Sequence, residues 1–166
     1  MGKLKRILKH LATGRRQVGK VFQSTALRRI EEAIGESERL HDGELRFAVE
    51  AALEWPALWN NQSPRARAIE VFSQLRLWDT EHNSGVLIYL LLADRKVEIV
   101  ADRGIHARVG HRGWVEICQQ MELRFREGEF ESGTIEAIHA ITRLLQQHFP
   151  ASRDNPNELP DTPIVL

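Results

Sequence analysis

The chain has 166 residues, of which 42% are hydrophobic and 28% are charged, and these values fit one globular domain with a sizeable core. Lys and Arg number 23, as do Asp and Glu, so the formal net charge is zero and the chain as a whole is not expected to bind nucleic acid. No apolar run reaches the about 18 residues of a membrane-spanning helix. The single cysteine, Cys118, excludes an intramolecular disulfide and favours a reducing compartment, so we expect a cytoplasmic protein.

The neutral total conceals an uneven distribution of charge. Residues 1–30 contain nine Lys or Arg and no Asp or Glu. Residues 1–22 are therefore predicted to form a basic arm, which begins with a short amphipathic helix that ends at Gly14. The apolar stripe of this helix comprises Leu4, Ile7, Leu8 and Leu11. Such an arm suits an anionic membrane surface, which would make the protein peripheral to a membrane, or it docks on the acidic remainder of its own chain.

The next segments are predicted to be a helix, a strand and a second helix. Helical spacing extends over about residues 24–39. Residues 44–53 then alternate apolar and polar side chains, which predicts a strand with one apolar face. Ser63 followed by Pro64 is typical of a helix start, with Ser as the cap and Pro in the first turn, and this helix is expected to end near Trp78.

A hairpin of two strands is predicted in the middle of the chain. Residues 86–93 are apolar almost without a break, as in a strand buried on both faces. Asp94 and Arg95 form a tight turn into a third strand over residues 96–101, so these two strands must be antiparallel. A helix separates the first strand from the second, which predicts that those two are parallel.

Two long helices and a tail complete the predicted chain. Amphipathic helices are expected over residues 113–127 and 134–148. Residues 150–166 are rich in proline and are predicted to be an extended tail. Residues 23–149 then form an α/β domain, a three-layer α/β/α sandwich in which helices cover both faces of a small mixed sheet.

The hairpin carries a family resemblance. Residues 85–105, with their short Asp-Arg turn and the Gly-containing turn after the third strand, resemble the central hairpin of the TPM domain. Asp79 and Asn83 match the polar loop that precedes this hairpin in the family. Phe130 and Gly133 match the family's segment ahead of its last helix. The likeness spans about residues 24–149.

The resemblance implies a small α/β/α sandwich and several expectations about function. The family includes plant thylakoid-lumen proteins described as acid phosphatases, and many membrane-anchored bacterial members, some of which associate with LemA-type membrane proteins. This chain departs from the family in its basic arm and in the missing acidic position after Gly104. These departures favour a soluble interaction or accessory module with a protein partner, LemA-type or another membrane protein of that kind, over an active phosphatase.

The alternative is a metal-assisted phosphatase that acts on phosphomonoesters. Three loops are expected to meet at one edge of the sheet, namely residues 38–44, 79–83 and 102–111. Their titratable side chains are His41, Asp42, Glu44, Asp79, His82, Asp102, His106 and His111. Carboxylates with imidazoles hold divalent metals or act as general acids and bases, which makes this edge the candidate site.

The phosphatase hypothesis assigns specific roles at this edge. The catalytic candidates are Asp79, Asp102 and His41. The candidate ligands for Ca²⁺ or Mg²⁺ are Asp79, His82, Asp102 and Glu44, and Arg103 is the candidate for binding phosphate. The competing interpretation is structural, because Asp79 suits a turn, Asp42-Gly43 is a common turn pair, and Arg103 suits a salt bridge at the end of the hairpin.

Two further features have open interpretations. Arg46 and Glu50 fall on the polar face of the first strand, where they form an ion pair between sheet and helix or contact a substrate. Trp55 and Trp59 flank a proline in a loop, as anchors of that loop or as part of a patch for a partner. Cys118 is expected to be an inert thiol at the edge of the core.

Overall fold

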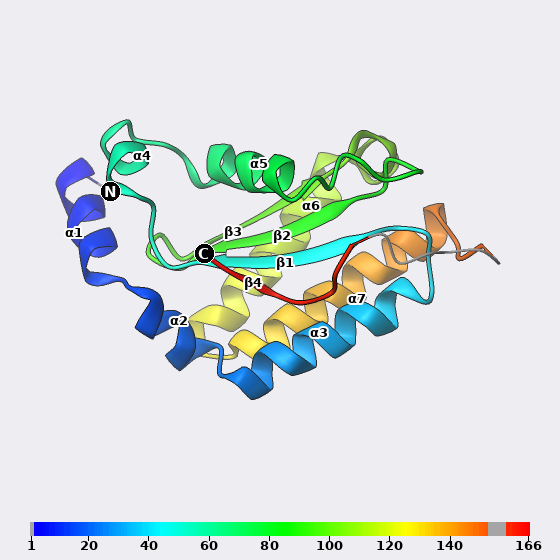
Figure 1. Ribbon diagram of the computed structural model, residues 1–166, viewed down its shortest axis with the longest axis horizontal. Coiled ribbons are helices and arrows are strands. Elements are labelled where there is room, and N and C mark those ends of the chain that lie inside the picture. Colours follow the sequence, from blue (N-terminus) through cyan, green and yellow to red (C-terminus); the bar gives the residue numbers. More distant parts are fainter. Residues whose placement is uncertain (1, 153–158) are drawn as a thin grey trace.

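The computed structural model describes residues 2–152 and 159–166, and Figure 1 shows a central sheet between two layers of helices. The helices are α1 (Lys3–Ala12), α2 (Arg15–Val21), α3 (Ser24–Glu38), α4 (Trp55–Trp59), α5 (Pro64–Gln74), α6 (Arg103–Arg126) and α7 (Phe130–His148). The strands are β1 (Leu45–Glu50), β2 (Val86–Leu91), β3 (Lys96–Ala101) and β4 (Ile164–Val165). In the sheet the strand order is β3-β2-β1-β4.

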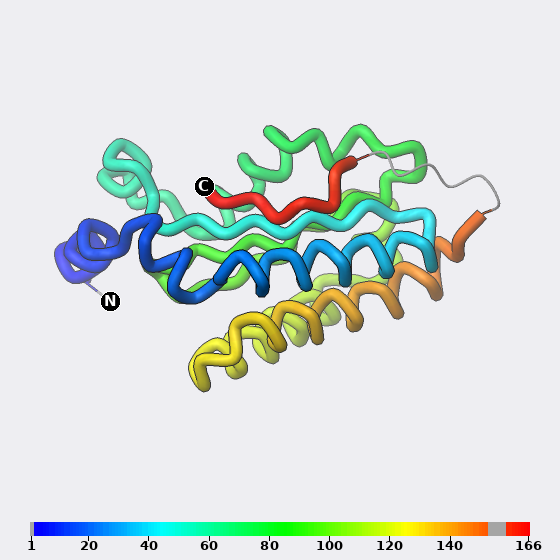
Figure 2. The backbone as a smooth tube through the Cα atoms, turned by 60° about the horizontal axis from the view of Figure 1, so that its bottom comes forward, coloured from blue at the N-terminus to red at the C-terminus, as the bar shows by residue number. Residues whose placement is uncertain are grey.

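The pairing of the first three strands is as predicted. β1 and β2 are parallel, with Leu45 opposite Val86 at the start of both strands. β2 and β3 are antiparallel, with Val86 opposite Ala101. Helices α3, α6 and α7 cover one face of the sheet and α5 covers the other, as Figure 1 shows. In the turned view of Figure 2, α3 and α7 run side by side beneath the strands. The predicted α/β/α sandwich is therefore confirmed.

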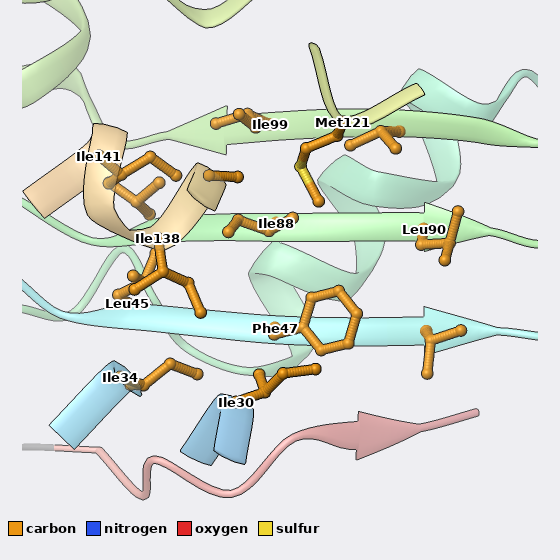
Figure 3. Packing of buried hydrophobic residues seen from close by; sticks show 14 of the residues in the cluster. Ile30, Ile34, Leu45, Phe47, Ile88, Leu90, Ile99, Met121, Ile138 and Ile141 are labelled. Atoms are coloured by element: carbon orange, nitrogen blue, oxygen red, sulfur yellow. The ribbon is translucent and has the colours of Figure 1, made fainter. Parts of the chain in front are cut away.

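The alternation of side chains along the strands divides the core into two clusters. In the larger cluster, strand residues pack against α3, α6 and α7, and Figure 3 shows them between the sheet and the helices. Its labelled members are Ile30, Ile34, Leu45, Phe47, Ile88, Leu90, Ile99, Met121, Ile138 and Ile141. In the smaller cluster the opposite strand residues, such as Leu87 and Tyr89, pack against α4 and α5. Because β2 contributes to both clusters, it is the buried centre of the fold.

The first strand is buried on both faces, although one polar face was predicted. All six residues of β1 are buried, and Arg46 and Glu50 are only 7% and 4% exposed. The carboxylate of Glu50 accepts hydrogen bonds from Arg67 of α5 (Nε to Oε2, 2.9 Å) and from the Tyr89 hydroxyl (2.6 Å). Glu50 thus forms an ion pair between sheet and helix, but its partner is Arg67 rather than Arg46. Because the Glu50 carboxylate is paired and hydrogen-bonded, α5 can cover this face of β1 without leaving a buried charge uncompensated.

The C-terminal residues contribute a strand that was not predicted. Residues 153–158 of the expected tail lie outside the described part of the chain, whereas Ile164–Val165 forms β4. β4 pairs parallel to β1, with Ala48 opposite Ile164, and the amide of Leu166 donates to the Val49 carbonyl at 2.9 Å. The apolar Ile-Val-Leu ending therefore occupies the edge of β1, which would otherwise carry unpaired backbone groups.

Helix boundaries differ from the prediction in the arm and in α6. The arm contains a second short helix, α2, whose Val18 and the following Phe22 are 1% exposed and belong to the larger core cluster. Helix α6 begins at Arg103 rather than at residue 113, and it continues past a kink at Gly110, where φ is 75°. That positive φ is a conformation that glycine adopts without strain, so the chain bends there and stays helical on both sides.

Candidate functional site

The three polar loops do lie at one edge of the sheet, because β1 and β2 are parallel and β3 runs the other way. Their side chains, however, do not converge. In the described part of the chain, no three His, Cys, Asp or Glu side chains are grouped so that they could hold a metal ion. The predicted Ca²⁺ or Mg²⁺ ligands are Asp79, His82, Asp102 and Glu44, and each is described below with its own surroundings.

Three of the predicted site residues lie on the solvent side of the edge. Asp79 is exposed and accepts a hydrogen bond from Arg76 at 2.6 Å, three residues earlier. His82 and Arg103 are also exposed. An exposed pair such as Arg76 and Asp79 contributes about 0–1 kcal/mol to stability, so it ties down the loop weakly.

Asp102 is the N-cap of α6. Its Oδ1 accepts a hydrogen bond from the Arg103 amide at 2.6 Å, and the residue is 7% exposed. Its Oδ2 is buried with no hydrogen-bond partner among the described residues. The helix end also packs against the loop before β2, since a Cβ on Gly104 would lie 2.6 Å from the Asn83 carbonyl oxygen and 2.9 Å from that of His82. Asp102 therefore starts a helix at a crowded edge, with one oxygen unused.

His41 is enclosed and serves the packing of two helices. It is 0% exposed, and its Nδ1 accepts the Gly43 amide at 3.2 Å while Nε2 contacts the Ser37 hydroxyl at 2.8 Å. The same hydroxyl contacts Thr142 of α7 at 2.6 Å. Burial lowers the pKa of His41 to about 4, although the nearby backbone groups and Asp42 oppose that change. His41 is thus a neutral link between α3 and α7, away from solvent.

Glu44 belongs to a buried cluster of three acids and one base that the sequence did not reveal. Glu38, Glu44 and Arg46 are 6%, 5% and 7% exposed. Glu38 accepts the Leu45 amide at 2.8 Å, and Glu44 accepts the Leu159 amide at 3.2 Å. Asp161 completes the cluster by approaching α3, where a Cβ on Gly35 would lie 2.7 Å from its Oδ2.

Burial and the neighbouring charges shift the pKa values of this cluster. Burial raises the pKa of Glu38 to about 9; the Leu45 amide opposes that shift, and Glu44 and Asp161 add to it. Burial also lowers the pKa of Arg46, against the attraction of the surrounding acids. Glu38 is therefore protonated at neutral pH, and the Arg46 charge faces Glu44 and Asp161. No local pattern could reveal this cluster, because Asp161 lies far from the others in sequence.

A groove lies at the opposite end of the sheet, where β2 turns into β3. It encloses about 840 Å³ and is bounded by the arm, the β2–β3 turn and the α6–α7 junction. Apolar side chains line it, including Leu90, Leu92, Phe125 and Phe130. Its basic residues are Lys9, Lys20, Arg95, Lys96 and Arg126, against the acids Asp94 and Glu122. We refer to this cavity as the basic groove.

Both acids of the basic groove are already paired. Glu122 binds Lys96 at 3.2 Å. Asp94 accepts hydrogen bonds from Arg6 (Nη2 to Oδ2, 2.8 Å) and from His10 (3.1 Å), and these attach α1 to the β2–β3 turn. Burial by itself would raise the pKa of Asp94, but the hydrogen bonds from Arg6 and His10 outweigh it and hold the pKa below the usual value. The remaining bases leave the groove with an excess of positive charge.

Two other features identified in the sequence also have defined surroundings. Trp55 and Trp59 are 54% and 57% exposed, and their rings lie 5.7 Å apart. Burial raises the pKa of the Cys118 thiol to about 12, which makes it a poor nucleophile. None of the helices in the described ranges is both long enough and apolar enough to cross a bilayer.

Comparisons with known proteins identify the family. The family model described as "TPM domain" matches residues 17–144. The solution structure of the BA42 protein from the psychrophilic bacterium Bizionia argentinensis is similar, with a TM-score of 0.77 and 28% identity over 87% of this chain and 95% of that one. The N-terminal domain of a P. gingivalis protein shares the fold, with a TM-score of 0.61 and 15% identity over 85% of this chain and 95% of that one. No curated protein matches. Since the family model covers most of the chain, this protein belongs to the TPM-domain family.

Proposed function

We propose that this chain is a non-catalytic interaction module that binds an acidic, partly apolar segment of a partner protein in the basic groove. The observation that carries this proposal is the composition of the groove, which has apolar walls and five basic residues. Of its two acids, Asp94 pairs with Arg6 and Glu122 pairs with Lys96, which leaves four basic residues without an acid of the groove. A cavity of this size with a few charged groups at its rim is typical of a binding site. The membrane proteins of the LemA type that the family suggests are the first partners to examine.

The predicted catalytic residues support a module more than an enzyme. His41 is enclosed between helices, Asp79 pairs with Arg76, and Asp102 caps α6. The structural contacts of each side chain explain its position in the fold without a catalytic role. As part of the proposal we place the protein in the cytoplasm, on the ground that its one cysteine needs no oxidising compartment.

The basic groove is tested with a charge-reversed variant. The probe is a fluorescein-labelled helical peptide of alternating Glu and Leu clusters, followed by anisotropy. We expect the double variant Lys20→Glu/Arg126→Glu to weaken binding by about tenfold or more, because each reversed rim charge removes on the order of 1 kcal/mol of attraction. Arg143→Glu, on an exposed position of α7 outside the groove, is the matched control and should bind as the unaltered chain does. Equal binding by both variants, or no binding at low salt, would contradict the proposal.

A second function, the metal-assisted phosphatase, keeps one supporting observation. The buried Oδ2 of Asp102 has no hydrogen-bond partner among the described residues and belongs to an edge where loop carbonyls approach α6. Oxygen atoms of this kind suit Ca²⁺ or Mg²⁺. The test is hydrolysis of p-nitrophenyl phosphate with and without each metal. Metal-dependent turnover that disappears in Asp102→Asn, and persists in Asp79→Asn, would favour this function over the module.

A further inference from the structure

Helices α1 and α4 together present an unusual exposed apolar surface. Ten large apolar side chains are exposed in the described part of the chain, and five of them lie on these two short helices at one end of the molecule (Figure 1). They are Leu4, Leu8 and Leu11, which are 71%, 59% and 68% exposed, and Trp55 and Trp59, which are 54% and 57% exposed. We call these five residues the α1–α4 face.

The two helices are held next to each other by defined contacts. The ammonium group of Lys3 lies 4.7 Å from the centre of the Trp59 ring. The guanidinium of Arg6 donates to the Asn61 side chain at 3.2 Å and to the Gln62 carbonyl at 2.7 Å, directly after α4. The leucines and tryptophans are therefore held at the same end of the molecule (Figure 1).

Helix α1 docks on its own protein through polar residues and leaves its leucines outside. Arg6 and His10 bind Asp94, and His10 also accepts the Leu53 amide at 3.0 Å. His10 is 4% exposed, which is far less than any leucine of the helix. Only Ile7 of the apolar stripe packs against the core. An amphipathic helix of a soluble protein ordinarily turns its apolar stripe toward the core. Here the polar contacts of α1 hold its leucines on the outside, where they can contact an external apolar surface.

The charges on α1 favour an anionic surface as the partner of these leucines. Lys3 and Lys5 are exposed on the same helix as the leucines, and residues 1–30 contain no acidic residue. Two copies of the chain meeting through this face would bring two such basic arms together, which is unfavourable. A basic polar side combined with Leu and Trp is instead the composition of helices that lie in the surface of an anionic bilayer.

The shape of the face also favours a bilayer over a protein partner. Helices α1 and α4 lie at one end of the molecule (Figure 1), and none of the five exposed side chains lines the basic groove. Protein partners bind hot-spot residues in matching pockets, whereas a bilayer admits any projecting apolar side chain to the depth of its headgroups. Tryptophan is enriched at that depth because its ring is amphipathic. We propose that the α1–α4 face docks on membranes that contain anionic phospholipids, with the leucines inserted and the lysines at the headgroups.

The first experiment measures sedimentation of the full 166-residue chain with vesicles. Vesicles of phosphatidylcholine alone are compared with vesicles of equal parts phosphatidylcholine and phosphatidylserine. We expect binding only to the anionic vesicles, weakening as salt rises. Lys5→Glu should reduce the partition coefficient about fivefold or more, since each basic residue near such a surface contributes about 1 kcal/mol.

The leucines are tested with variants that leave the fold intact. Leu4→Ser/Leu8→Ser alters only exposed side chains and should reduce binding about tenfold or more. Ile69→Ser/Leu123→Ser alters two equally apolar exposed residues elsewhere and is the matched control. Binding unaffected by the first variant, or reduced as much by the second, would overturn the proposal. Light scattering on the same samples detects self-association, and a dimer abolished by Leu4→Ser/Leu8→Ser without vesicle binding would also overturn it.

Tryptophan fluorescence locates the face in the bilayer. Lipids brominated near the headgroup should quench the emission on binding, and Trp55→Phe/Trp59→Phe should remove most of the quenched signal. Of the other two tryptophans, Trp114 is 3% exposed, and Trp78, which is 52% exposed, precedes β2 at the opposite end of the sheet. Quenching that persists in this variant would contradict the proposed orientation. The two proposals are tested at different residues, since Lys20→Glu/Arg126→Glu changes neither the leucines nor the tryptophans of the face.

Discussion

Glu38 ends α3, and its carboxyl lies with Glu44, Arg46 and Asp161 where the C-terminal residues meet the sheet. Burial raises its pKa from the usual value of 4.5 to about 9. Between these two values the folded state holds a proton that the unfolded state releases. Raising the pH across this window therefore reduces the free energy of unfolding, and the loss is complete once the folded carboxyl has ionised.

We predict that Glu38→Gln is more stable than the unaltered chain at about pH 9, by more than about 1 kcal/mol. The amide oxygen of glutamine still accepts from Leu45, and it has no charge to desolvate. The advantage should shrink as the pH falls and should be smallest below about pH 4, where Glu38 is protonated in both states. Urea unfolding at several pH values measures the difference. Glu36→Gln, on an exposed position of the same helix, is the control. Parallel pH curves for Glu38→Gln and the unaltered chain would show that the carboxyl ionises normally.

The sequence predicted on which face of a strand a residue lies, but not which residues it contacts. Alternation placed Arg46 and Glu50 on the same face of β1, and they are there. The sequence could not show that Arg67 and Tyr89 bind Glu50, or that Asp161 approaches Glu38, because such contacts join distant segments. His41 was a catalytic candidate because imidazole suits that chemistry, yet a buried histidine between two hydroxyl-bearing helices suits packing equally well.

At the scale of elements, α1 depends on a side-chain attachment rather than on its apolar stripe. The Arg6–Asp94 pair is largely buried, with side chains 12% and 7% exposed. A buried charged hydrogen bond of this kind contributes more than an exposed pair, and removing one partner leaves the other charge without compensation. The position of the helix therefore depends on Asp94.

We predict that Asp94→Asn releases α1 without unfolding the sheet. The loss should appear as faster amide hydrogen exchange in residues 3–12 and faster tryptic cleavage there, with a fall of about 1–3 kcal/mol in the stability of that helix alone. Asp79→Asn breaks an exposed pair with Arg76 and should leave both readouts unchanged. Uniform acceleration of exchange across β2 in Asp94→Asn would instead mean that the attachment supports the whole domain.

The long, periodic elements were predicted and the short ones were not. Helical spacing identified α3, α5 and α7, and the apolar run identified β2. Helices α2 and α4 have seven and five residues, too few for a period to be recognised. The start of α6 at Arg103 was missed because two glycines, Gly104 and Gly110, precede the periodic part of the helix. Its actual start is set by the Asp102 cap.

At the scale of the whole molecule, β4 completes the sheet on the side of β1. The same C-terminal residues place Asp161 beside Glu38 and the Leu159 amide on Glu44. One segment thus covers both a strand edge and a set of buried charges. The sequence could not predict this strand, since two paired residues carry no alternation.

We predict that removing residues 159–166 lowers the free energy of unfolding by about 2–4 kcal/mol, through lost apolar burial and exposed charges. The bare edge of β1 should also promote association, visible as light scattering that grows with concentration. Val165→Thr in the full chain keeps the backbone pairing at a residue that is 38% exposed, and it should cost less than about 1 kcal/mol. A truncated chain as stable and monomeric as the full one would show that β4 is dispensable.

Helix α1 forms part of the wall of the basic groove through Lys9 and Ala12, while its leucines belong to the α1–α4 face. One element that contacts two ligands couples them. A groove ligand that contacts α1 favours the attached position of this helix. A surface that holds the leucines in that position must then raise the affinity of the groove ligand, and the ligand must raise the affinity for the surface by the same factor. Asp94, which attaches the helix, therefore sets the size of that reciprocal effect.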